Sequence, residues 1–246
     1  MNLCIDQGNS RTKVAIFSDE NKILKSLSYK RFTSTDVERL FSLYPLRNSI
    51  VSSVVNIEPS VINALHRRSQ RMILFDHLTP TPITNGYETP ETLGQDRLAA
   101  AVGAMTLAPD TNLLIIDIGS AITYDFVDDA GCYHGGNIAP GLKMRLSVLN
   151  QMTTRLPLID VDENELIPLF GRNTRDAIKA GVVRGIAFEV KGYMRTLQER
   201  VGHFRTFLTG GHAAFIMNTV QSPLDYNKNL VLIGLNRILE YNLHLA

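Results

Sequence analysis

The stretch Ile5-Asp6-Gln7-Gly8-Asn9-Ser10-Arg11-Thr12-Lys13 returns in altered form half a chain later, as Ile116-Asp117-Ile118-Gly119-Ser120-Ala121-Ile122-Thr123. Both copies begin with Ile-Asp-x-Gly, and both carry a threonine six residues after the aspartate. Each copy also follows an apolar segment of the kind that forms a strand. The repeat therefore predicts a duplicated domain, with one glycine-containing hairpin in each half facing a shared anionic ligand.

The first copy has the residue types that a turn over a phosphate group needs. Gly8 allows close backbone approach, so that successive N–H groups can converge on anionic oxygen. Ser10 adds a hydroxyl and Lys13 a positive charge. Asp6 would be repelled by phosphate, and it fits only as an anchor for Mg²⁺, usually through water. A solvent-exposed hairpin turn is the simpler alternative for one copy alone. The second copy favours the phosphate interpretation.

Composition sets wide limits on function. The chain has 246 residues, 44% of them hydrophobic and 20% charged, with a formal net charge of +1. This length and balance fit a globular protein with two lobes, and they give no electrostatic case for binding nucleic acid or a membrane surface. Only Cys4 and Cys132 are present, without metal-ligand spacing, and no signal peptide is evident. We therefore expect a cytoplasmic protein with reduced thiols.

Hydrophobic periodicity predicts an alternation of strands and helices. The N-terminal half is expected to contain a three-stranded antiparallel meander, two further strands, and three helices. The third of these helices, over about 96–107, follows an irregular loop at 79–92. The second half repeats the strand meander from residue 112. Its expected helices cover about 141–149, 174–201 and 235 to the end, and a strand is expected at 204–208.

Several motifs in order resemble those of the type III pantothenate kinases. The first hairpin resembles that family's Asp-x-Gly-Asn-Ser/Thr-x-x-Lys, and the second resembles its Asp-x-Gly-Thr-Ala-x-Thr. Further family-like segments are Gly94-Gln95-Asp96-Arg97, Gly135-Gly136-Asn137-Ile138-Ala139-Pro140-Gly141 and Gly171-Arg172-Asn173-Thr174. The resemblance extends from residue 1 to about 240, and the ordered set is more specific than any one motif.

The resemblance implies a fold and a reaction. The fold would be α/β, a duplicated actin-like (ribonuclease H-like) arrangement of mixed sheets flanked by helices. Its lobes would be residues 1–110 and 111–246, with ATP in the cleft between them. The reaction would be ATP-dependent phosphorylation of pantothenate to 4'-phosphopantothenate, the first step of coenzyme A biosynthesis. A non-enzymatic transcriptional accessory factor on this fold, or a kinase for another small alcohol, is the alternative.

The resemblance also implies roles for individual residues. Asp96 would be the catalytic base. Asp6 would hold Mg²⁺ through water, and Asp117 a monovalent cation, K⁺ or NH₄⁺. Contacts to ATP would come from Asp6, Gly8, Asn9, Ser10, Lys13, Ser120, Gly210 and Gly211. Contacts to pantothenate would come from Tyr87, Gly94, Gln95, Asp96, Arg97 and Thr174. Thr174 would reach the site of a partner subunit, which makes a homodimer the functional unit.

Structural alternatives remain open for several of these residues. Asp96 and Arg97 could be an ordinary helix N-terminus, and Thr174 could be a helix N-cap. Tyr87 could pack on its own lobe, and Gly210-Gly211 could form a helix C-cap or a tight turn. Arg145 and Arg155 are expected at a surface or interface.

Two features depart from the expected pattern. Ser120 replaces the family's threonine, and His212 stands where the family usually has aspartate. Lys13 follows Asp6 by seven residues, and the residue at the same distance after Asp117 is Tyr124. The second hairpin therefore lacks a matching lysine, and the two halves are expected to differ.

Overall fold

The computed structural model describes residues 1–162 and 165–245. The chain divides by its internal contacts into two compact units. Unit 1 contains Met1–Pro109, Ala130–His134 and Asn229 onward, and unit 2 contains Asp110–Asp129 and Gly135–Lys228. The predicted lobe boundary at residue 110 stays a prediction.

The sheet of unit 1 has five strands in the order β3-β2-β1-β4-β5. The strands β1, β2 and β3 pair antiparallel, which confirms the predicted meander, and β1, β4 and β5 pair in parallel. Their bounds are β1 Asn2–Gln7, β2 Thr12–Phe17, β3 Ile23–Tyr29, β4 Asn48–Ser53 and β5 Arg71–Leu74.

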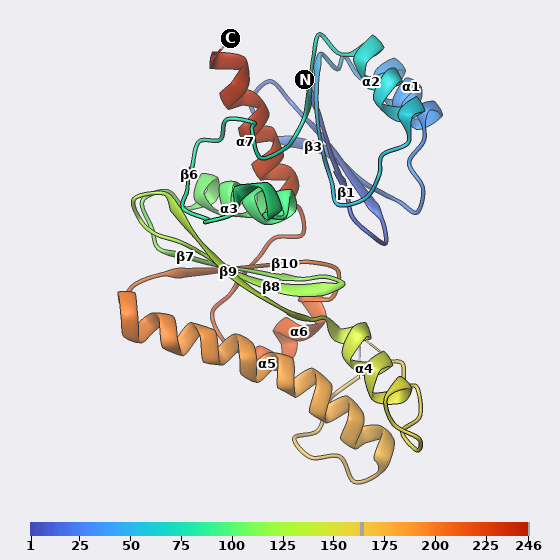
Figure 1. Cartoon of the computed structure of the whole chain (residues 1–246), viewed down its shortest axis with the longest axis vertical. Helices are drawn as coiled ribbons and strands as arrows, with labels where there is room; N and C mark the ends of the chain where they lie inside the picture. Colours follow the sequence, from blue (N-terminus) through green and yellow to red (C-terminus); the bar gives the residue numbers. More distant parts are fainter. Residues whose placement is uncertain (163–164, 246) are drawn as a thin grey trace. The chain divides into compact units, whose positions relative to one another are not determined.

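Helices α1 (Ser34–Leu43) and α2 (Pro59–Arg68) connect these parallel strands. They bury an apolar stripe against one face of the sheet, where Leu3 and Ile5 of β1 are almost fully buried. Figure 1 shows α1 and α2 together on this side. The N-cap of α1 is Thr33, which forms a reciprocal capping box with Asp36.

Helix α3 (Gln95–Leu107) packs lengthwise against α7 (Leu230–Leu245). The contact is close because two glycines face backbone atoms of the opposite helix. A Cβ on Gly234 would lie 1.7 Å from the Ala99 carbonyl oxygen, and one on Gly103 would lie 2.2 Å from that of Leu230. The predicted start of the last helix near Leu235 was five residues too late, because the apolar run from Leu230 is already helical and packed on α3.

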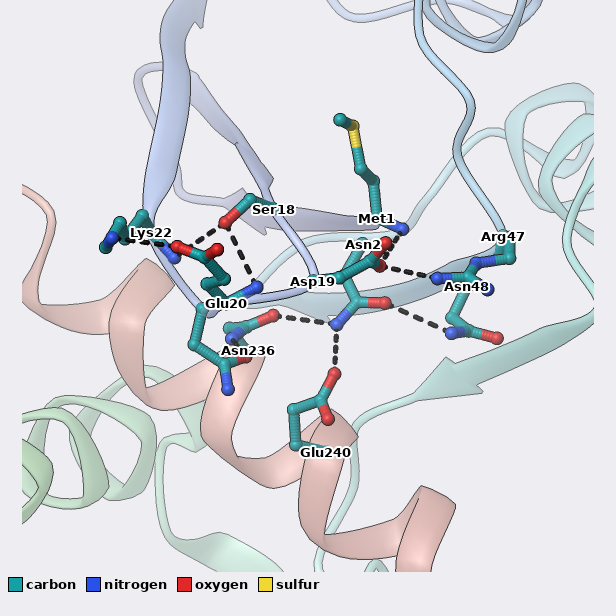
Figure 2. A network of polar contacts seen from close by, with 11 residues as sticks. Met1, Asn2, Ser18, Asp19, Glu20, Lys22, Arg47, Asn48, Asn236 and Glu240 are labelled. Carbon is teal, nitrogen blue, oxygen red and sulfur yellow. Dashed lines mark hydrogen bonds and ion pairs between the residues drawn. The ribbon is translucent and has the colours of Figure 1, made fainter.

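Polar side chains tie α7 to the other face of the sheet, as Figure 2 shows. The Asn2 amide donates to Asn236 Oδ1 at 3.0 Å and also to Glu240, while Asn48 donates to Asn2 Oδ1 at 3.1 Å. Asn2 and Asn236 are each only 3% exposed. Because buried amides that lack partners are costly, this network fixes which face of α7 meets β1.

Unit 2 repeats the strand order of unit 1. Its strands are hydrogen-bonded in the order β9-β8-β7-β10-β11, so that β7 takes the central place of β1, and the first three residues of β9 belong to unit 1. The pair β7–β8 is antiparallel, and β7, β10 and β11 are parallel. The bounds are β7 Leu113–Ile118, β8 Ala121–Val127, β9 Cys132–Pro140, β10 Arg205–Thr209 and β11 Asp225–Tyr226. The predicted duplication is therefore confirmed.

The helices of unit 2 are α4 (Leu142–Gln151), α5 (Thr174–Val201) and α6 (Ala213–Val220). They enclose an apolar cluster with Leu114, Ile116 and Ile118 of β7. Helix α6 and strand β11 were not predicted, because each is short and has no strong periodic pattern. Among the described residues, no helix has both the length and the hydropathy that a membrane span requires.

Candidate active site

The first hairpin places Asp6 and Lys13 directly opposite each other on β1 and β2. Its turn is closed by a hydrogen bond from the Gly8 N–H to the Arg11 carbonyl at 3.1 Å. A Cβ on Gly8 would meet only the Arg11 oxygen, at 3.4 Å. Asn9 and Ser10 are exposed at the tip. Within the described residues, space is therefore left beside Gly8 in this turn.

The second hairpin has a shorter turn, with only Gly119 and Ser120 between β7 and β8. The Gly119 N–H donates to the Ala121 carbonyl at 3.0 Å. The shorter turn changes the pairing, so that Thr123 lies opposite Asp117. The structural counterpart of Lys13 is therefore Thr123. The prediction that Tyr124 takes this place, made by counting residues from the aspartate, was wrong. Tyr124 lies in the apolar cluster of unit 2.

Two glycines allow neighbouring segments to reach this second turn. A Cβ on Gly141 would lie 2.3 Å from the Ser120 carbonyl oxygen. A Cβ on Gly210 would lie 2.5 Å from Asp117 Oδ1, and Gly210 has φ +102°, which glycine tolerates best. No atom of the described residues lies within 4 Å of a Cβ built on Gly211. Gly210 thus forms a tight turn against β7. Of these two glycines, Gly211 is the one with space for a ligand beside its Cα among the described residues.

Asp96 lies in the first turn of α3 and accepts a hydrogen bond from the Arg97 backbone N–H, at 2.9 Å to Oδ1. The same oxygen would lie 2.7 Å from a Cβ on Gly94, the N-cap residue. Gly94 therefore has a local physical role, because any side chain there would displace the Asp96 carboxylate. A carboxylate in the first turn is also favoured by the helix dipole.

Tyr87 and Arg97 lie together in unit 1. The Arg97 guanidinium lies over the Tyr87 ring, 5.8 Å from its centroid, and Arg97 is 6% exposed. Tyr87 also contacts Tyr133, with ring centroids 6.3 Å apart. Tyr87 does pack within its own unit, and it remains half-exposed beside the segment that carries Asp96.

The loop at 79–92 is more ordered than the sequence predicted. It contains a short strand, β6 (Thr84–Asn85), and a 3₁₀ helix, η1 (Pro90–Thr92). Strand β6 pairs in parallel with the beginning of β9, placing Asn85 beside Tyr133. After η1, the Gln95 amide donates to the Leu93 carbonyl at 3.0 Å. These contacts fix the backbone on both sides of Tyr87, from β6 to the N-terminus of α3.

Thr174 is the first residue of α5, but it is not the N-cap. Asn173 caps the helix, with Oδ1 accepting from the Asp176 N–H at 3.0 Å. Thr174 is exposed and lines a groove of about 910 Å³ between α4, α5 and the segment before α5. The N-cap alternative for Thr174 was therefore wrong, because asparagine precedes it and takes that position.

Arg145, which was expected at a surface or interface, lines this groove and is also tied to a neighbouring helix. Its side chain is 17% exposed and forms two hydrogen bonds to the Glu189 carboxylate, at 2.6 and 2.7 Å. These bonds lower the pKa of Glu189 below its usual value. The Tyr124 hydroxyl donates to the same carboxylate at 3.1 Å, and burial raises its pKa. Arg145 therefore joins α4 to α5 inside unit 2, whereas Arg155 is exposed as expected.

His212, which stands in place of the family's aspartate, is at the N-cap of α6. Its backbone N–H donates to the Ile118 carbonyl at 3.1 Å, while its side chain makes no capping hydrogen bond to α6. Unlike a carboxylate at the same place, which can accept from the free N–H groups of a helix start, His212 contributes no side-chain cap to α6.

Sequence reasoning missed two polar side chains beside the aspartates. Ser52 on β4 is the strand neighbour of Asp6, and Thr209 on β10 is the strand neighbour of Asp117. Both are fully buried, and neither hydroxyl has a hydrogen-bond partner within the described residues. Unsatisfied hydroxyls next to carboxylates fit a hydrated cation, which offers both waters and charge. The available signal was a polar residue at the end of each buried strand.

Comparison with known proteins identifies the family. The model of the type III pantothenate kinase family matches residues 2–196. The chain belongs to the type III pantothenate kinase family. A type III pantothenate kinase of Phocaeicola vulgatus is 43% identical over 98% of this chain and 99% of its own length. A type III pantothenate kinase of Bacteroides fragilis is 41% identical, with 98% of each chain covered.

A solved structure from Campylobacter jejuni shares the fold. It is described as a candidate Baf family transcriptional activator, and it is 22% identical, with a TM-score of 0.62 over 98% of this chain and 99% of that one. At this identity the likeness supports only the duplicated actin-like α/β fold of the type III pantothenate kinases. Membership of a kinase family does not favour the alternative of a non-enzymatic accessory factor.

Proposed function

We propose that this chain transfers the γ-phosphoryl group of ATP to the primary hydroxyl of pantothenate, the first step of coenzyme A biosynthesis. Family membership along most of the chain supports the reaction. The observation that carries the assignment is the position of Asp96. Gly94 leaves room for its carboxylate, and the Arg97 N–H fixes one of its oxygens at the N-terminus of α3.

The ATP phosphates bind along the two hairpins. In unit 1 the contacts come from Asp6, Gly8, Asn9, Ser10 and Lys13, and in unit 2 from Ser120, Gly210 and Gly211. Gly8 and Gly211 support this assignment, because neither needs to be glycine for the protein's own packing. Lys13 neutralises phosphate charge, and Asp6 holds Mg²⁺ through water. Bound Mg²⁺ supplies charge neutralisation at the phosphates.

Asp96 is the general base. It accepts the proton of the pantothenate hydroxyl while the hydroxyl oxygen bonds to the γ-phosphorus, and the bond from that phosphorus to the β,γ-bridging oxygen breaks to release ADP. Tyr87, Gly94, Gln95, Arg97 and Thr174 bind and orient pantothenate. The buried Arg97 supports this role, because a guanidinium held on the Tyr87 ring is well placed to bind acceptor oxygens.

Two finer features belong to the same proposal. Asp117 holds a monovalent cation, K⁺ or NH₄⁺. The chain acts in the cytoplasm as a homodimer, in which Thr174 reaches the partner's site. The groove beside Thr174 supports the dimer, because Met144 and Val148 expose apolar surface there, each at 46%.

The test is a coupled assay with ATP and pantothenate, run for the unmodified chain and for Asp96→Asn. We expect turnover to fall by roughly 10²–10⁴-fold in the variant, the range for loss of a general base, with ATP binding retained. The control is Glu91→Gln, which changes an exposed carboxylate of η1 and should leave turnover unchanged. No product from the unmodified chain in either K⁺ or Na⁺ would refute the proposed function.

A further inference from the structure

Ser52 is a buried hydroxyl whose hydrogen-bonding capacity is unused. Its side chain is 0% exposed, and Oγ has no partner among the residues that the structure describes. Such a group is unfavourable in the free protein, because it has lost its hydrogen bonds to water without replacement. The same strand shows the usual solution. Ser49 of β4 is equally buried, but its Oγ lies 2.8 Å from Ser69 Oγ.

Ser52 lies in a row with two proposed nucleotide-site residues. Asp6 is directly opposite Lys13 on one side and directly beside Ser52 on the other. Residues paired in this way project from the same face of a sheet, and adjacent strands are about 4.8 Å apart. One bound water or one hydrated cation can therefore contact both the Asp6 carboxylate and the Ser52 hydroxyl.

Unit 2 contains the same arrangement independently. Asp117 is opposite Thr123 and beside Thr209. Thr209 is 0% exposed, and its hydroxyl also has no partner within the described part of the chain. The two sheets have the same strand order, so Ser52 and Thr209 occupy corresponding places on the strands next to β1 and β7. An unsatisfied hydroxyl at this place in both units is difficult to attribute to chance packing.

We infer that Ser52 and Thr209 are positioning residues for the cations held by Asp6 and Asp117. On this proposal, the Ser52 hydroxyl bonds to the hydration shell of the Mg²⁺ that accompanies ATP. The Thr209 oxygen contributes to the site of the monovalent cation. The inference rests on the proposed function, and it adds two residues to the site. It also explains why the unsatisfied hydroxyls persist, since they gain partners when cation and nucleotide bind.

Ser52→Ala is the first test. It removes the hydroxyl oxygen Oγ and, because that oxygen has no hydrogen-bond partner among the described residues, its removal leaves no other polar group there without a partner. The free variant should melt at the same temperature as the unmodified protein or higher. Its Kd for ATP with Mg²⁺, measured by calorimetry, should weaken about tenfold, while ATP binding in EDTA should not change. The matched control Ser49→Ala should melt at a lower temperature and bind ATP with Mg²⁺ normally.

The outcomes separate this inference from the proposed function. If Ser52→Ala binds ATP with Mg²⁺ as tightly as the unmodified chain, Ser52 has no positioning role, whatever its melting temperature. If Ser52→Ala melts well below the unmodified protein, the hydroxyl is structural and the inference is again wrong. If the unmodified chain itself makes no product from ATP and pantothenate, the proposed function fails first.

Thr209→Val gives the corresponding test in unit 2, since valine has nearly the same shape without the hydroxyl. Addition of KCl in place of NaCl should raise the melting temperature of the unmodified protein in the presence of ATP. That difference should be lost in Thr209→Val and kept in Ser49→Ala. An equal K⁺-dependent shift in Thr209→Val and the unmodified chain would contradict the role of Thr209.

Discussion

Asp6 and Lys13 face each other across β1 and β2, whereas the corresponding partner of Asp117 is the uncharged Thr123. The two hairpins therefore share a backbone arrangement but differ in charge. The first combines a carboxylate with an ammonium group beside an open turn. The second places Thr123 and Thr209 on the strands beside its carboxylate. This difference supports separate proposed roles, with Mg²⁺ and phosphates at the first hairpin and a monovalent cation at the second.

Replacement of Lys13 tests the role of the first hairpin. Lys13→Met keeps the aliphatic stem and removes the charge. Hydrogen bonds to charged groups contribute about 1.5–3 kcal/mol, so we expect the Kd for ATP to rise roughly 10- to 150-fold. Lys22→Met, which removes an exposed lysine paired with Glu20, should leave the Kd unchanged. Equal ATP binding by Lys13→Met and the unmodified chain would exclude Lys13 from the phosphate site.

Gly94→Ala tests the positioning of Asp96 without changing its chemistry. The new Cβ would lie 2.7 Å from Asp96 Oδ1, so the carboxylate must move. Because displacement of a catalytic group by about 1 Å can cost roughly 10²-fold in rate, we expect kcat to fall by that order. ATP affinity should not change. A kcat within twofold of the unmodified value would show that the carboxylate tolerates the shift.

The crossing of α3 and α7 can be tested with a matched pair of glycines. Gly234→Ala places a methyl group 1.7 Å from the Ala99 oxygen, and we expect a loss of about 3 kcal/mol in unfolding free energy, at the upper end for overpacking. Gly192→Ala lies in α5, where no atom of the described residues is within 4 Å of the added Cβ. It should stabilise the protein by about 0.4–1 kcal/mol. Denaturant titration measures both, and similar values for the two would contradict the close crossing.

The ion pair of Arg145 and Glu189 predicts a pH effect on stability. Arg145 holds the pKa of Glu189 below the ordinary value of 4.5, so the folded state favours the ionised carboxylate. Its stabilisation is fully present above pH 4.5 and is lost as the pH falls through the lower pKa of the folded state. Because Glu189 is 37% exposed, we expect Glu189→Gln to cost only about 1 kcal/mol at neutral pH.

Melting temperatures measured from pH 7 to pH 3 check this prediction. The unmodified protein should lose stability more steeply than Glu189→Gln below pH 4.5, so that the two curves converge. Parallel curves over that range would show that the carboxylate contributes no pH-dependent stability. Glu199→Gln is a suitable control, because Glu199 is 64% exposed and pairs with Arg195 on the surface of the same helix.

Features set by short segments could be predicted from sequence. The first meander follows its apolar runs, because strand formation there depends on residues close together in the sequence. Features set by distant contacts could not. The partner of Asp117 depended on the length of one turn, and the start of α7 depended on its packing against α3. The sequence shows Ser52 only as a polar residue near the end of a buried strand, and its register with Asp6 on another strand reveals its relation to the site.

The position of α7 has a consequence for how the chain is made. Unit 1 contains Met1–Pro109, yet the helix that covers α3 begins only at Leu230. A ribosome adds about 5–20 residues per second, so roughly 6–24 seconds pass between the synthesis of these two parts. During that interval the face of α3 around Ala99 and Gly103 lacks its native cover. Nascent chains of this protein should therefore depend on chaperones until α7 emerges from the ribosome and packs on α3.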